Sequence, residues 1–175
     1  MDIRSIPLRN IQDNIRRYRE RGVTTGGRYT LFELLQEEKR RSPSPFPVVE
    51  VAQVIVSQSR SSADGLTSYK NLWRHFTGLP WQGNYAQRKV GAALGQVIAY
   101  CARHKLPVIT TLVVKSDSRK LAVTAINAIY HEAREYGFDV GIHPDQFVQE
   151  QQQLARALVL TQFNPEEDDS DLTSR

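Results

Sequence analysis

The chain is poor in sulfur, with one cysteine and one methionine among 175 residues. A single cysteine excludes an internal disulfide framework and any metal site built from several thiolates. No apolar run approaches the roughly 20 residues needed to span a bilayer, and residues 1–5 lack the apolar core of a secretory signal. These absences predict a cytoplasmic, reduced protein that is not embedded in a membrane.

The charge is unevenly distributed along the chain. The net charge is +4, yet residues 60–120 hold ten lysines and arginines against two aspartates. Residues 1–41 are also basic, whereas residues 121–175 carry ten acidic side chains against three arginines. Concentrated positive charge predicts binding to a polyanion such as nucleic acid. The acidic C-terminal region could shield the basic face or contact a protein partner.

The first 45 residues have the pattern of two helices followed by a connector. An amphipathic helix is expected from Leu8 to Gly22, with arginines, among them Arg16 and Arg17, on its outer face. Thr30 is placed to cap a second helix. Three prolines in residues 42–47 predict an extended connector. We therefore expect a basic N-terminal region (1–45), a globular domain (46–163) and an acidic, disordered tail (164–175).

Helices dominate the expected globular domain. Residues 48–58 fit either a helix or a strand, and Pro47 favours the helix because it suits a first turn. A loop over 57–65 follows. The remaining apolar patterns predict helices over about 69–76, 85–104, 121–133 and from 144 onward, with a strand over 108–114. The expected fold is mainly α (α+β), with a winged-helix-like centre, flanking helices and a small β element from 107–115, for which 138–142 is a candidate partner.

The centre of the chain also resembles a known family. The residues are Leu66-Thr67-Ser68-Tyr69, a helix ending in Gly78-Leu79-Pro80, the run Arg88-Lys89-Val90-Gly91-Ala92-Ala93-Leu94, and Leu106-Pro107 before an apolar strand. Over residues 66–115 the chain resembles the winged-helix DNA-binding domain of DNA alkyltransferases and alkyltransferase-like proteins. The resemblance implies that Tyr69 lies against the DNA backbone and that Arg88 enters the base stack where a nucleotide is flipped out.

One departure from that family concerns its chemistry. The family's nucleophile lies in a Pro-Cys-His-Arg run, whereas this chain has Pro107-Val108-Ile109-Thr110. Cys101 lies earlier, on the inward stripe of its helix, as a small buried residue. Alkyl transfer is therefore not expected, and a non-catalytic reader of DNA remains consistent with the resemblance.

The residues alone allow both a binding and a structural interpretation. Arg88 lies near the N-terminus of its helix and off the apolar stripe, so it should point to solvent with the positive helix dipole behind it. Arg88 and Lys89 could equally be ordinary solvated charges, and Tyr69 could pack with Trp73 and Phe76 as core.

The leading hypothesis is a non-enzymatic DNA-binding protein without a cofactor, for which DNA is favoured over RNA. The expected nucleic-acid contacts are Arg16, Arg17, Tyr69, Lys70, Arg74, Asn84, Gln87, Arg88 and Lys89.

Two alternatives belong to other functional classes. His131, Glu132 and Glu135 are typical of the zinc-protease helix except that Glu135 replaces its second histidine, and His143 or Asp145 could join them, so they could form a metal-dependent enzyme acting on nucleic acid. Alternatively, the segregated charges could make an accessory or inhibitory subunit that binds another protein. The glycine-rich segment 22–28 matches neither phosphate-binding fingerprint.

Overall fold

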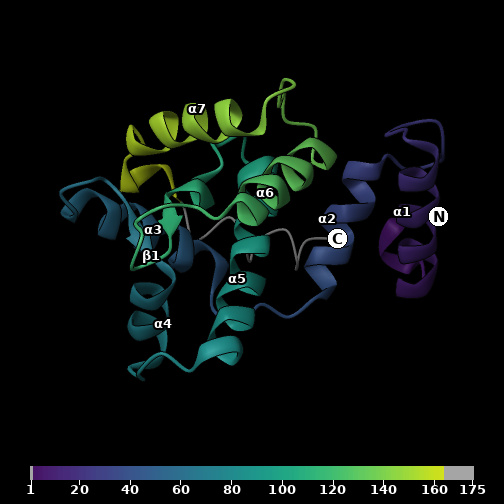
Figure 1. Cartoon of the computed structure of the whole chain (residues 1–175). Helices are drawn as coiled ribbons and strands as arrows, with labels where there is room; N and C mark the ends of the chain where they lie inside the picture. The colour runs from purple at the N-terminus through teal and green to yellow at the C-terminus, as the bar shows by residue number, and fades with distance from the viewer. Residues whose placement is uncertain (1, 164–175) are drawn as a thin grey trace.

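A computed structural model describes residues 2–163, and these are mostly helical with one small parallel sheet (Figure 1). This arrangement confirms the expected mainly α (α+β) class. The elements in chain order are η1 (Ile3–Ser5), α1 (Leu8–Arg21), α2 (Leu31–Arg41), α3 (Val48–Ser61), β1 (Thr67–Ser68), α4 (Tyr69–Thr77), α5 (Gly83–Arg103), η2 (Ile109–Leu112), β2 (Val113–Val114), α6 (Val123–Glu135), α7 (Pro144–Arg156) and η3 (Leu160–Gln162).

The N-terminal helices form where their end signals predict. Gly22 closes α1 in the left-handed conformation, at φ 64°. Thr30 caps α2 with the full capping box, because its Oγ1 accepts from the Glu33 amide at 3.2 Å while Glu33 Oε2 accepts from the Thr30 amide at 2.7 Å. The residues between α2 and α3 form neither helix nor strand, which suits their three prolines, and the chain bends at Pro45 and Phe46.

The ambiguous segment after Pro47 is a helix, as favoured. Its buried face carries Val51, Ala52 and Ile55 at helical spacing. The helix α3 continues to Ser61, so the loop expected over 57–65 is wrong for its first five residues. Serines in that stretch fit helix and loop alike, and packing of Val56 and Ser59 into the interior decides for the helix.

Helices α4 and α5 are joined by the short turn 78–82. Ser68 caps α4, since its Oγ accepts from the Asn71 amide at 3.2 Å, and Gly78 ends the helix at φ 67°. Helix α5 begins at Gly83, so Gly83 and Asn84 form its first turn rather than a loop. It then runs through the middle of the molecule (Figure 1).

The apolar segment 108–114 is the main correction to the expected fold. Most of it is the 3₁₀ helix η2, and only Val113–Val114 are extended. The amide and hydroxyl of Thr111 both donate to the Val108 carbonyl, at 3.2 and 2.7 Å, which closes a turn instead of a ladder. The whole segment is buried among helices, so its β-branched side chains suit burial rather than a sheet.

The sheet has a different second strand from the expected one. β1 pairs with β2 in parallel, with Thr67 opposite Val113 and Ser68 opposite Val114. Residues 138–142 are not a strand but the connector between α6 and α7, where the Tyr130 hydroxyl donates to the Gly141 carbonyl at 2.7 Å.

Helix α7 begins at Pro144 as expected, and it leaves Leu154 53% exposed. The expected disordered tail, residues 164–175, lies outside the described residues. Within residues 2–163, no helix is both long and apolar enough to cross a bilayer.

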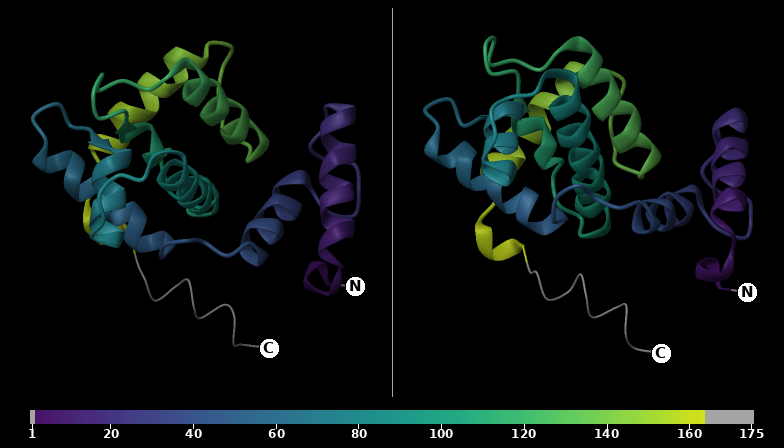
Figure 2. Two further views of the ribbon diagram at one scale, coloured as in Figure 1. Left: turned by 60° about the horizontal axis from the view of Figure 1, so that its bottom comes forward. Right: turned by 90° about the horizontal axis from the view of Figure 1, so that it is seen from below.

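Two hydrophobic clusters hold the elements together. The larger one joins α3, α4, α5 and the segment 109–114. The second joins α1 and α2 to α6, α7 and the C-terminal half of α5. Helix α5 contributes to both clusters. Its first turns lie at one end of the molecule, beside α4 (Figures 1 and 2). The α1–α2 pair lies at the other end.

Candidate nucleic-acid interface

Four predicted contact cations lie exposed on the helix pair α4–α5, and we call them the α4–α5 cations. They are Lys70, Arg74, Arg88 and Lys89. Within residues 2–163, none of the ion pairs involves any of these four side chains. None of the four is therefore held in a close ion pair by a carboxylate of the described chain, although Asp117 lies near enough to Lys70 for its pKa to be lowered by that charge.

The first two of these cations share one side of α4. Lys70 and Arg74 are one helical turn apart, while Leu72 and Trp73 on the opposite side are buried. This division gives α4 one apolar side and one basic side.

The other two lie in the second turn of α5. Arg88 and Lys89 are exposed, as predicted, and the buried Val90 and Leu94 face the core. No side chain caps this helix, and its first turn holds no acidic residue. The unsatisfied backbone amides and the dipole therefore favour an anion near Arg88. Asn84 and Gln87, also predicted contacts, are exposed on the same turns.

Lys115, one of the ten basic residues of 60–120, is a further cation near Lys70 that was not among the predicted contacts. The pairing of Ser68 with Val114 brings the residues that follow them, Tyr69 and Lys115, together. The pKa of Asp117 is lowered mainly by the Ser118 amide and also by the charges of Lys115 and Lys70. Both lysines therefore lie near Asp117. Only the long-range strand pairing could have identified Lys115.

Tyr69 has a structural role whatever else it does. It is half-buried and packs against the larger hydrophobic cluster. Burial raises the pKa of its phenol, which therefore stays protonated. Tyr69 thus packs as part of the core, and the exposed part of its side chain lies at the start of α4.

The structure does not bring the basic N-terminal helix to this surface. Helix α1 lies at the opposite end of the molecule from α4 in each view (Figures 1 and 2). Arg16 pairs with Asp13 at 2.7 Å, whereas Arg17 is exposed. These two arginines could meet only a distant part of a long ligand.

The candidate metal residues are engaged elsewhere. Glu135 accepts two hydrogen bonds from Arg19, at 2.6 and 2.7 Å, and Glu132 lies 3.7 Å from Lys39. These contacts tie α6 to α1 and α2, while His131 is exposed. Among the described residues, no group of three or more His, Cys, Asp or Glu side chains is placed to hold a metal ion.

The region of the missing nucleophile is closed and apolar. Cys101 is completely buried, as predicted, and burial raises the pKa of its thiol to about 12. Thr110 is buried as well, and its hydroxyl has no hydrogen-bond partner in the described part of the chain. Neither side chain is presented to a ligand at the surface.

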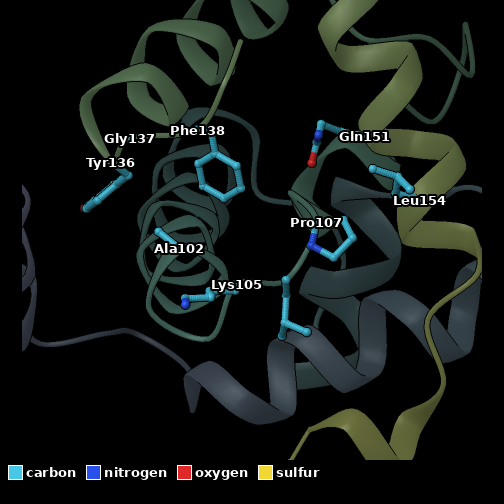
Figure 3. Close-up of a pocket in the computed structure, with 9 residues that line it drawn as sticks. Ala102, Lys105, Pro107, Tyr136, Gly137, Phe138, Gln151 and Leu154 are labelled. Atoms are coloured by element: carbon cyan, nitrogen blue, oxygen red, sulfur yellow. The ribbon is translucent and has the colours of Figure 1, made fainter.

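A cavity of about 360 Å³ lies at the other end of α5. Phe138, Pro107 and Leu154 surround it, with Lys105 at its edge (Figure 3). Gln151 also lines it, but its side-chain oxygen already accepts from the Val108 amide at 2.8 Å. Lys105 lies just beyond the end of α5 at Arg103, and about 15 residues of helical rise, roughly 22 Å, separate Arg103 from Arg88, so this cavity is not part of the cationic surface.

Comparison with known proteins adds no relative. No protein family, curated protein or solved structure matches the chain.

Proposed function

We propose that this protein binds DNA without acting on it chemically, and that the α4–α5 cations form its main contact surface. The observation that carries the proposal is Arg88, which is exposed, unpaired with any described carboxylate, and next to an uncapped helix N-terminus. A phosphate placed there would meet a guanidinium, backbone amides and a favourable dipole together.

The two helices supply complementary contacts under this proposal. Lys70 and Arg74 on α4 would neutralise phosphates without reading bases, because lysine and arginine contacts to the backbone carry no sequence information. Arg88, with Asn84 and Gln87, lies on the turns of α5 whose side chains could reach base edges. Lys115 extends the positive charge beyond the start of α4.

A matched pair of arginine substitutions tests the proposal. Arg88→Ala should weaken DNA binding about fivefold or more, the lower part of the range for one arginine contact to DNA. Arg134→Ala removes the same charge from an exposed site on α6 that has no ion pair in the described chain, and it should change affinity less than twofold. Fluorescence anisotropy with labelled duplex and single-stranded DNA measures both.

Arg134 is a better control than Arg119, another arginine outside the α4–α5 cations. The Arg119 guanidinium donates to Asp64 at 2.8 and 2.9 Å and to the Leu66 carbonyl at 2.9 Å, so its loss would disturb the fold. If Arg88→Ala and Arg134→Ala lose the same affinity, the binding depends on total charge alone, and the α4–α5 cations are not the contact surface.

A further inference from the structure

Exposed apolar side chains lie among the α4–α5 cations. Leu79 in the turn 78–82 is 46% exposed, and Tyr85 in the first turn of α5 is 50% exposed. Trp81, between them, is half-buried against the core. An aromatic ring left half in water beside exposed cations suggests a ligand that has both apolar faces and negative charge.

The turn that presents these side chains is held in one conformation. The Trp73 indole donates to the Pro80 carbonyl at 2.9 Å, and the Leu79 amide donates to the Thr77 hydroxyl at 3.1 Å. The Tyr85 ring meets Trp73 edge to face, with 6.0 Å between centroids. This edge contact restrains the tyrosine ring before any ligand arrives, which lowers the entropic cost of binding.

Positive charge flanks the exposed ring. Lys89 Nζ lies over one face of the Tyr85 ring, 5.7 Å from its centroid, which leaves the other face for a base. Arg88 is three residues from Tyr85, on the same side of α5. A ring beside cations matches the repeating chemistry of a single strand, in which each base offers an apolar face and each linkage a phosphate. The stacked bases of a duplex do not offer such faces along their length.

We propose that Tyr85 stacks on an unpaired base, so that single-stranded DNA is the preferred ligand of this surface. The inference rests on the proposed DNA-binding function and names its substrate class. The strand's phosphates would follow Arg88 and Lys89.

The test compares two ligands across variants of Tyr85 and a control. The ligands are a labelled oligothymidylate of about twenty nucleotides, longer than the roughly 4–16 nucleotides that one such site covers, and a duplex of the same length. Tyr85→Ala should weaken oligothymidylate binding about tenfold, within the range for loss of one base–aromatic stack, and duplex binding less than twofold. Tyr85→Phe should retain wild-type affinity, because the stacking ring remains.

A control variant removes an exposed apolar side chain elsewhere. Leu154→Ala, on α7, should leave both affinities unchanged. Because Tyr85 contacts Trp73, the thermal unfolding of Tyr85→Ala is measured alongside. If that variant is unfolded, Tyr85→Leu, which keeps bulk without an aromatic face, replaces it and should lose affinity for oligothymidylate as Tyr85→Ala would.

The outcomes distinguish failure of base stacking from failure of DNA binding. If Arg88→Ala weakens binding but the loss of the Tyr85 ring does not affect oligothymidylate, DNA binding stands and stacking is refuted. A loss on the duplex as large as on the single strand would also refute it, and would indicate a wedge between paired bases. Absence of binding to either DNA would refute both proposals.

Discussion

Glu37 is the most informative position for the stability of this fold. It is 5% exposed, and its carboxylate accepts hydrogen bonds from Arg40 at 2.7 Å twice and from Arg41 at 2.6 Å. Arg41 in turn donates to the Ile6 carbonyl at 2.6 Å and to the Arg4 carbonyl at 2.9 Å. The carboxylate therefore orients the arginine that anchors the N-terminal segment to α2.

We expect Glu37→Gln to lower the free energy of unfolding by about 2 kcal/mol at neutral pH. The amide keeps the volume but loses the charge, and charge-assisted hydrogen bonds contribute roughly 1.5–3 kcal/mol each where they are buried. The figure stays below the 3–5 kcal/mol for breaking a fully buried pair because Arg40 is partly exposed to water. Urea denaturation followed by far-UV circular dichroism measures the difference.

The pH dependence of that difference provides a second check. Hydrogen bonds from Arg40, opposed by burial and assisted by Arg41, hold the pKa of Glu37 below its usual value of 4.5. The stabilisation is therefore complete above that value and is lost as the pH falls through the lowered pKa. The gap between wild type and Glu37→Gln should shrink in that acidic range.

Glu20→Gln is the matched control, since Glu20 is exposed and its ion pair with Arg16 is long, at 4.0 Å. It should cost less than about 0.5 kcal/mol. The reasoning is refuted if Glu37→Gln is no more destabilising than this control, or if its effect does not change with acid.

Three further predictions concern the closed region around Cys101. With a thiol pKa near 12, Cys101 should resist a thiol-specific chromogenic reagent in the native protein and react once denaturant is added; rapid labelling of the native state would contradict its burial. Thr110→Val should stabilise the fold by about 1 kcal/mol, because the lost hydroxyl has no partner in the described chain. Thr111→Val, whose hydroxyl donates to Val108 at 2.7 Å, should instead destabilise it by about 1 kcal/mol in the same denaturation assay.

Local signals in the sequence predicted the helices well. The cap at Thr30 and the closing glycine at Gly78 each act within a few residues, so the neighbouring residues in the sequence suffice to identify them. The outward position of Arg88 followed from the helical period alone. These features depend on short-range geometry.

Features that depend on distant partners could not be predicted. Residues 109–112 form a 3₁₀ turn because surrounding helices bury them, and burial selects the same β-branched residues that a strand would. The pairing of Thr67 with Val113, and with it the approach of Lys115 to α4, joins residues more than forty positions apart. Tyr85 was missed as a surface contact because its exposure depends on how the 78–82 turn packs.

The most direct test of the central claim is the dependence of DNA affinity on salt. If the four α4–α5 cations each neutralise a phosphate, log affinity against log salt concentration should have a slope of about −3.6 for duplex or about −2.8 for single-stranded DNA. Arg88→Ala should make that slope shallower by about one phosphate's share, and Arg134→Ala should not. Binding that is insensitive to salt, or a slope that Arg88→Ala leaves unchanged, would contradict the account.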